Sequence, residues 1–359
     1  MIWIIHFLAV NILLLFSVLA RNKKIFIYGT FIYSVFTFGQ RWMAGVDFPY
    51  YLLYYLTEFQ VREPFYKLLQ NALANYNLYF GILIFVIYTI TLFNNYRFIL
   101  KLDKSNILII YLFLFMEIYF MQMSQIRQFI AISFFINAYF YAFDKKYYKL
   151  ILNILFACLF HISAILVIPF LFIKLNFKKK YIVYLVILCF ILPFIDIRLI
   201  FNTGIFGLYS HYLGGQFDQP LSIFHMLRYY AILGLILIIL MRLKFKMSSS
   251  VDKLIINGLL VYLFLYGLSF KFAPVLRVSN YFKIFEVVFL CYYYKEIYKF
   301  NYKLVRSVII SVYICFYAAI AYIDPYHITR YEFKPLKIYD DKTNTELYKE
   351  VQYYHLKNQ

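Results

Sequence analysis

The chain has 359 residues, of which 64% are hydrophobic and 15% are charged, and its mean hydropathy is +0.71. A water-soluble domain could not bury this much apolar surface, so the composition excludes a soluble protein and indicates a polytopic α-helical membrane protein. The formal net charge of +19 comes from short lysine clusters between apolar blocks. This pattern is typical of membrane topology and provides no continuous basic face for nucleic acid.

Ten apolar blocks along the chain each have about the length of one membrane crossing or slightly less. The first block is expected to be an uncleaved span that starts outside, because Arg21, Lys23 and Lys24 follow it. The blocks are residues 2–20, 25–43, 79–96, 105–123, 128–143, 181–195, 221–241, 254–272, 281–294 and 304–323.

Residues 144–180 allow two interpretations, because basic clusters stand at both ends of this segment. One long helix would place the clusters on opposite sides of the membrane, whereas a hairpin turning at His161 would place both inside. The hairpin puts twelve of the later cations inside and five outside, and a single crossing reverses that ratio. We therefore predict an all-α polytopic fold of about 12 membrane segments, with a short helical hairpin around His161 and both ends outside.

Three predicted outer regions follow from this topology. Residues 44–78 form an extracytoplasmic loop region long enough for one or two interfacial helices, and residues 196–220 carry glycines that favour an irregular loop. Pro325 and Pro335 interrupt any helix in the charged end of the chain. We expect one transmembrane helical domain over 1–323 and an extracytoplasmic polar tail over 324–359.

Arginine and lysine are distributed differently on the two predicted faces. The inner face has four arginines and 17 lysines, whereas the outer side before the tail has six arginines and three lysines. A guanidinium binds phosphate or carboxylate in two places, so this bias favours an anionic ligand such as a lipid-linked diphosphate. Alternatively, the arginines pair with the local acids Asp47, Glu58, Glu63 and Asp196. The six outer arginines are Arg41, Arg62, Arg127, Arg198, Arg228 and Arg277.

Five short motifs in order give the chain a family resemblance over roughly residues 40–290. The chain resembles the EpsG-type bacterial membrane proteins, which are related in role to the Wzy polymerases of O-antigen and capsular polysaccharide. The tail after about residue 324 lies outside the resemblance. The motifs are G-x-D-x-x-x-Y (Gly45, Asp47, Tyr51), E-P-F (Glu63, Pro64, Phe65), R-Q-x-x-A (Arg127, Gln128, Ala131), F-H-x-S-A (Phe160, His161, Ser163, Ala164) and R-x-x-N-Y-F (Arg277, Asn280, Tyr281, Phe282).

The resemblance implies a polysaccharide polymerase, a glycosyltransferase at the outer face of the bacterial cytoplasmic membrane. A growing glycan on undecaprenyl diphosphate would be transferred to a lipid-linked repeat unit, so donor, acceptor and membrane lipid are the expected partners, and a chain-length regulator protein is left open. No cofactor or metal is expected, and the chain has no D-x-D motif for a nucleotide-sugar. The alternatives are a flippase or transporter of lipid-linked oligosaccharide and a membrane acyltransferase.

Glycosyl transfer requires groups that stabilise the leaving diphosphate. Arg127 and Arg277 are the leading candidates, because each lies where an apolar helix meets the outer side and each lies in a matched motif. Gln128 and Asn280 could add neutral donors, and Arg41 is a further diphosphate candidate.

The attacking hydroxyl also needs a base, and three residues compete for that role. Asp47 follows an apolar helix in the first large outer loop, and His161 titrates near neutral pH at the turn of the hairpin. Glu63 is the third candidate. Structural alternatives are that Asp47 caps a helix or pairs with Arg41, that Glu63 begins a helix beside Pro64, and that His161 hydrogen-bonds within the bundle.

A last group of residues is expected to contact the substrate. His211, beside two tyrosines in the glycine-containing loop, could touch sugar because aromatic rings stack on pyranose CH groups. The expected substrate-binding residues are Tyr51, Ser163, Arg198, Arg228 and His211.

Overall fold

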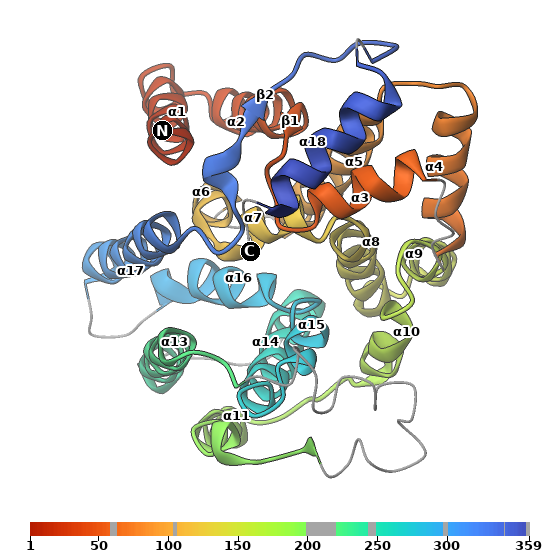
Figure 1. The fold of residues 1–359 in the computed structure, drawn as a ribbon. Coiled ribbons are helices and arrows are strands. Elements are labelled where there is room, and N and C mark those ends of the chain that lie inside the picture. Colours follow the sequence, from red (N-terminus) through yellow and green to blue (C-terminus); the bar gives the residue numbers. More distant parts are fainter. Residues whose placement is uncertain are drawn as a thin grey trace. The chain divides into compact units, whose positions relative to one another are not determined.

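The computed structural model of the chain describes residues 1–57, 63–102, 106–198, 220–242, 249–296, 301–340 and 342–356. These residues are mainly helical (Figure 1), which confirms the predicted all-α class. The α-helices are α1 (Ile2–Leu19), α2 (Lys23–Phe38), α3 (Phe48–Leu56), α4 (Pro64–Asn75), α5 (Phe80–Leu100), α6 (Asn106–Phe115), α7 (Glu117–Ser124), α8 (Ile126–Phe143), α9 (Tyr147–Phe160), α10 (Ala164–Val167), α11 (Lys179–Leu188), α13 (Ile223–Arg242), α14 (Ser250–Leu268), α15 (Pro274–Ser279), α16 (Ile284–Tyr293), α17 (Tyr302–Ile323) and α18 (Asn344–Leu356).

Short elements complete the fold. The two-residue strands β1 (Arg41–Trp42) and β2 (Glu332–Phe333) pair in antiparallel fashion, with Arg41 opposite Phe333 and Trp42 opposite Glu332. The 3-10 helices are Ile168–Phe172, Leu192–Phe194, Tyr294–Glu296 and Ile328–Arg330.

Six helices among the described residues are long and apolar enough to cross a membrane, namely α1, α5, α8, α13, α14 and α17. The bent pair α6 and α7 makes seven if it counts as one span. The protein is therefore a multi-pass membrane protein, but the predicted count of about 12 segments is not confirmed. Several predicted spans are short helices, such as α9 with 14 residues and α16 with 10, whereas a simple crossing needs about 20.

The predicted span over 105–123 is broken. Helices α6 and α7 meet at an angle of 56° around Met116, and α7 begins at Glu117. The Glu117 carboxylate accepts a hydrogen bond from the Tyr326 hydroxyl. A carboxylate in the first turn of a helix is favourable because main-chain N–H groups point toward it. The acid inside an apolar block therefore marks the start of a new helix.

The helix also breaks at His161, as predicted. Helix α9 ends at Phe160, a short turn follows, and α10 begins at Ala164. The Ala164 N–H donates to the His161 carbonyl oxygen at 3.0 Å, which closes the turn. His161 is thereby held at the end of a helix.

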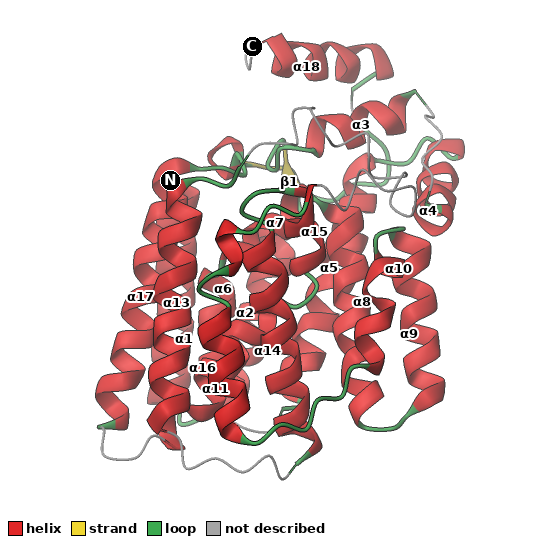
Figure 2. Ribbon diagram, turned by 90° about the horizontal axis from the view of Figure 1, so that it is seen from below, coloured by secondary structure: helices red, strands yellow, loops and turns green. Residues whose placement is uncertain are grey.

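The chain divides into two compact units. Unit 1 contains residues 1–137, 151–165 and 317–359, and unit 2 contains residues 138–150 and 166–316. In unit 1, α2 packs against α1, α5 and α6, while α18 packs against α3. Figure 2 shows α3, α4 and α18 gathered at one end of the long helices of this unit. The predicted loop region 44–78 thus carries two helices, and part of the predicted tail covers one of them.

Unit 2 is built around α14, which packs against α11, α15 and α16. A buried ion pair joins α13 to α16, because Arg228 Nη2 lies 2.8 Å from Glu286 Oε1. The Tyr313 hydroxyl donates to the same carboxylate oxygen at 2.7 Å. Burying these charges in an apolar unit requires such partners, so the pair fixes the packing of α13 on α16.

The entry to the 44–78 region is held tightly against the end of α7. Gly45 has φ +109°, and a Cβ at this position would lie 2.5 Å from the Met123 carbonyl oxygen. Arg41 donates to that same oxygen through Nη2 at 2.9 Å, and to the Phe38 carbonyl oxygen through Nη1 at 2.9 Å. The loop therefore starts from a fixed position.

Gly45→Ala is expected to destabilise the protein by about 1–3 kcal/mol, because alanine disfavours this φ and its methyl group meets main chain. Thermal unfolding of the purified protein in detergent measures the change. Gly234→Ala, inside α13, is the matched control, since a Cβ there has no heavy atom within 4 Å. Equal melting temperatures for wild type and Gly45→Ala would contradict the expectation.

Candidate active site

Two helix starts in the 44–78 region position the acidic candidates. Asp47 precedes α3, which has Pro49 in its first turn, and Glu63 precedes α4, which begins with Pro64. Proline suits the first turn of a helix because its fixed φ is helical and the N–H it lacks would be unpaired there. Neither acid caps its helix through its side chain. Both carboxylates are therefore left for other partners.

The Glu63 carboxylate joins the two motifs that carry Arg127 and His161. Its Oε2 lies 2.7 Å from Arg127 Nη1, and its Oε1 lies 2.9 Å from His161 Nδ1. Glu63 is only 6% exposed, while Arg127 and His161 are 23% and 19% exposed. The three residues come from the start of α4, the first turn of α8 and the turn after α9. We call them the Glu63 cluster.

Two tyrosines surround the Arg127 guanidinium. Its central carbon lies 5.4 Å from the centre of the Tyr51 ring and 5.6 Å from that of Tyr66, which is within cation–π range. The Tyr51 hydroxyl also hydrogen-bonds to the guanidinium. Burial raises the pKa of both tyrosine hydroxyls, so both stay neutral at physiological pH.

One nitrogen of Arg127 remains for a ligand. Arg127 Nε is buried and has no hydrogen-bond partner among the described residues, and the same holds for the Tyr66 hydroxyl beside it. Buried donors of this kind are costly when they stay unpaired. The cluster therefore presents unused hydrogen-bonding capacity next to a permanent positive charge.

The charges of the cluster keep Glu63 ionised. Burial alone would raise the pKa of its carboxyl, but the His161 hydrogen bond and the positive charge of Arg127 outweigh burial and lower it. When the ionised Glu63 accepts a hydrogen bond from His161 Nδ1–H, Nε2 of the neutral ring is left as the acceptor nitrogen.

The other predicted residues of unit 1 lie around this region in different ways. Asp47 is half-buried one helical turn before Tyr51, and its charge acts on that side chain. Gln128 is buried beside Arg127 in α8, and Ser163 lies in the turn after α9. Arg41 has two of its three nitrogens on main-chain carbonyls, so it ties α2 to α7.

The remaining predicted residues belong to unit 2. Arg277 is in the last turn of α15, and Asn280 directly follows that helix. Neither polar atom of the buried Asn280 side chain has a hydrogen-bond partner within the described part of the chain. Arg198 lies at the surface and pairs with Asp196 at 2.5 Å. His211 lies outside the described residues.

These contacts test the alternative that the outer arginines pair with nearby acids. It is confirmed for Arg127 with Glu63 and for Arg198 with Asp196. Arg228 pairs instead with Glu286, an acid that the sequence analysis did not select. Glu286 lies in the apolar block 281–294, and an acid in such a block is the signal that could have identified it.

Tyr66 is the other residue that sequence reasoning missed. It directly follows the E-P-F motif, but the 40 tyrosines of the chain make any single one hard to select.

Among the described residues, no three His, Cys, Asp or Glu side chains are grouped as metal ligands. Both Glu63 oxygens face nitrogen donors, Arg127 Nη1 and His161 Nδ1.

Comparison with known protein families matches residues 24–337 to the EpsG family, which covers most of the chain. The chain belongs to the EpsG family. All three residues of the Glu63 cluster lie within the matched segment, so the cluster is part of the EpsG region of the protein. No curated protein and no solved structure matches the chain. EpsG membership and the apolar helices together support a membrane glycosyltransferase of the polysaccharide polymerase type.

Proposed function

We propose that this protein polymerises a polysaccharide at the outer face of the cytoplasmic membrane. It transfers the growing glycan from undecaprenyl diphosphate to a sugar hydroxyl of a lipid-linked repeat unit. Support comes from the EpsG family match, from the multi-pass helical fold and above all from the Glu63 cluster. The cluster combines a guanidinium, which can bind phosphate, with an imidazole, which can accept a proton.

His161 is the proposed base. The acceptor hydroxyl gives its proton to His161 Nε2 as its oxygen bonds to the anomeric carbon of the donor sugar. Glu63 orients the ring through Nδ1 and stabilises the imidazolium that forms. Glu63 is itself a weaker base than an ordinary glutamate, because its neighbours lower the pKa of its carboxyl group. Asp47 remains the second candidate for the base.

Arg127 is the proposed ligand of the leaving diphosphate. As the bond between the anomeric carbon and the phosphate oxygen breaks, the electron pair leaves with the diphosphate, and a guanidinium stabilises that charge. This role is supported by Arg127 Nε, which has no hydrogen-bond partner in the described part of the chain, while the Glu63 ion pair is made through Nη1. Gln128 is proposed as a further donor to the lipid-linked substrate, and Arg277 and Asn280, which belong to unit 2, stay candidates from the sequence.

Reconstitution in vesicles with one defined undecaprenyl-diphosphate-linked repeat unit, and without nucleotide-sugar, tests the proposal. Products that differ by one repeat unit are expected on a gel, because donor and acceptor are both lipid-linked. Empty vesicles and a heat-inactivated sample are the controls. Movement of the repeat unit across the bilayer without any longer product would show a flippase instead.

A further inference from the structure

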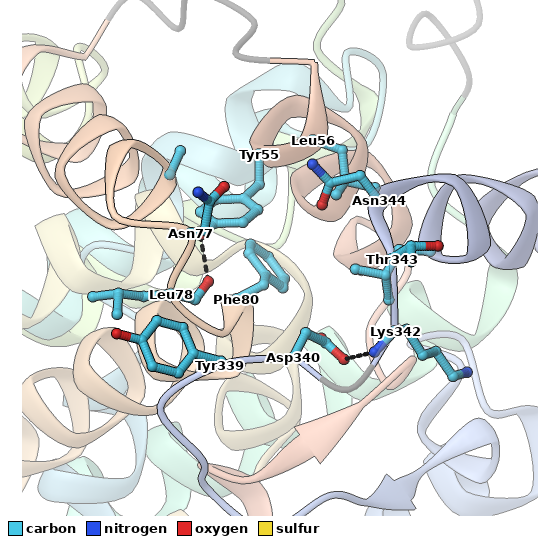
Figure 3. A pocket seen from close by; sticks show the side chains of 12 residues that line it. Tyr55, Leu56, Asn77, Leu78, Phe80, Tyr339, Asp340, Lys342, Thr343 and Asn344 are labelled. Atoms are coloured by element: carbon cyan, nitrogen blue, oxygen red, sulfur yellow. Dashed lines mark hydrogen bonds between the residues drawn. The ribbon is translucent and has the colours of Figure 1, made fainter.

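We propose that a pocket between the end of α3, the segment after α4 and the start of α18 binds a sugar unit of the glycan. This inference rests on the proposed function and adds a binding site for the saccharide. The pocket has a volume of about 270 Å³, and all its lining residues belong to unit 1. Figure 3 shows the side chains that line it. Its lining includes Tyr55, Asn77, Phe80, Tyr339, Asp340 and Asn344.

The lining combines aromatic rings with amide and carboxylate groups. The rings of Tyr55 and Phe80 lie 5.2 Å apart, and Tyr339 adds a third ring that is 62% exposed. Pyranose sugars present apolar CH faces that stack on such rings and hydroxyls that bond to amides and carboxylates. A site with few placed polar groups on an aromatic surface is typical of small-ligand recognition.

Asp340 supplies the strongest hydrogen-bond acceptor in the pocket. Its Oδ1 accepts from the Lys342 main-chain N–H at 3.1 Å and lies 3.4 Å from Lys337 Nζ, whereas its Oδ2 is buried and has no hydrogen-bond partner among the described residues. A buried carboxylate oxygen without a partner is costly, and a hydroxyl-bearing ligand would satisfy it. This unpaired acceptor favours a sugar, which carries hydroxyl donors, over a lipid acyl chain, which carries none.

The pocket does not suit a free anion. Lys342 is the lining cation, and its Nζ lies 2.6 Å from Glu350 Oε2, so its charge is already paired. The Asp340 carboxylate would also repel an anion. Burial, together with the Asp340 charge, raises the pKa of Tyr55 to about 12, so this hydroxyl stays neutral. A neutral, hydroxyl-rich ligand fits these groups best.

Main-chain and side-chain hydrogen bonds hold the two halves of the pocket together. Leu78 and Tyr339 form an antiparallel bridge, and the Tyr79 N–H donates to the Ile338 carbonyl oxygen at 2.8 Å. Trp42 Nε1 donates to Glu350 Oε1 at 2.7 Å, which ties α18 to the start of the 44–78 region. The site is thus formed before a ligand arrives, which lowers the entropy lost on binding.

The same two helices carry the pocket and the residues around Arg127. On α3, Tyr51 contacts Arg127 and Tyr55 lines the pocket, about 6 Å further along the helix on the same face. On α4, Tyr66 contacts Arg127 and Ala74 lines the pocket, about 12 Å further on. A glycan that reacts at the Glu63 cluster can therefore extend into the pocket.

Half of the pocket lies after the segment that matches the family. The EpsG match ends at residue 337, whereas Tyr339, Asp340 and Asn344 come after it. We expect this terminal part to select the sugar, while the matched part holds the Glu63 cluster.

Tyr339→Ala and Asp340→Asn test the pocket in the full-length protein. The probe is the lipid-free oligosaccharide released by mild acid from the host's lipid-linked repeat unit, and binding is followed by saturation-transfer NMR. Each change is expected to weaken binding about ten-fold, because a ring contact or a charged acceptor is lost. Tyr348→Ala, an exposed tyrosine of α18 outside the pocket, is the matched control and should bind like wild type.

The outcomes separate this inference from the proposed function. The inference is overturned if wild type does not bind the oligosaccharide, if both pocket variants bind it as wild type does, or if phospholipid displaces it. Failure of the polymerase proposal would appear instead as the absence of longer products in the reconstitution assay, with oligosaccharide binding still sensitive to Tyr339→Ala.

Discussion

His161→Ala is expected to lower kcat for polymer elongation by about 10²–10⁴-fold, because it removes the group that accepts the hydroxyl proton in the transition state. The KM for the lipid-linked acceptor should change little, since the sugar is held elsewhere. Initial rates of the reconstituted enzyme over a range of acceptor concentrations measure both constants. His161 Nδ1 faces Glu63 at 2.9 Å, which fixes the ring and leaves Nε2 for the substrate.

Two comparisons make this expectation specific. His225→Ala is the matched control. His225 hydrogen-bonds with Ser222 near the start of α13 and belongs to unit 2, whereas the Glu63 cluster belongs to unit 1. Its elongation rate should equal that of wild type. Asp47→Ala decides between the two candidate bases: if it abolishes turnover while His161→Ala retains it, the assignment of His161 is wrong.

The membrane class could be predicted from the sequence because it depends on local patterns. Apolar blocks report burial directly, and arginine among apolar residues is costly unless it has a partner or a ligand. The arginine argument selected Arg127 and Arg277 as candidates, and the hairpin turn together with imidazole chemistry selected His161. The ordered motifs added Glu63, and the family match confirms the resemblance that they carry.

The joining of those residues could not be predicted, because it depends on packing between distant segments. Glu63 and His161 are 98 positions apart, and nothing in either motif fixes their distance. Reasoning from one motif at a time ranked Asp47 above Glu63, whereas the structure places Glu63 between the two basic side chains. Span counting was limited for a related reason, because a helix buried among other helices can be shorter than a membrane is thick.

The terminal segment shows the same limit. Its polar composition predicts a solvated tail, and Pro325 and Pro335 predict breaks, consistent with the end of α17 at Ile323. The composition does not reveal that β2 pairs with β1 or that α18 packs on α3. These contacts need partners from the first 80 residues, so only the folded chain shows that the tail completes a pocket.

Arg127→Ala is expected to lower kcat by about 10²–10³-fold, because the developing charge on the leaving diphosphate loses its guanidinium. Arg127→Lys should recover only part of this loss, since an ammonium keeps the charge but cannot form the two-pronged contact with phosphate. Rates of elongation from the lipid-linked donor, together with retention of the donor on the immobilised protein, measure the two effects. Arg242→Lys, at the far end of α13, is the matched control.

Because Arg127 also contacts Glu63, lower activity in the arginine variants could come from lost stability or from lost diphosphate binding. The stability of each variant must therefore be measured. Loss of Arg127 leaves the buried Glu63 carboxylate with the His161 hydrogen bond but without its cationic partner, so some stability will be lost together with activity. The double variant Arg127→Met with Glu63→Gln removes both charges and should restore much of the melting temperature without restoring elongation. Elongation that recovers with stability would mean that Arg127 holds the fold and does not bind the diphosphate.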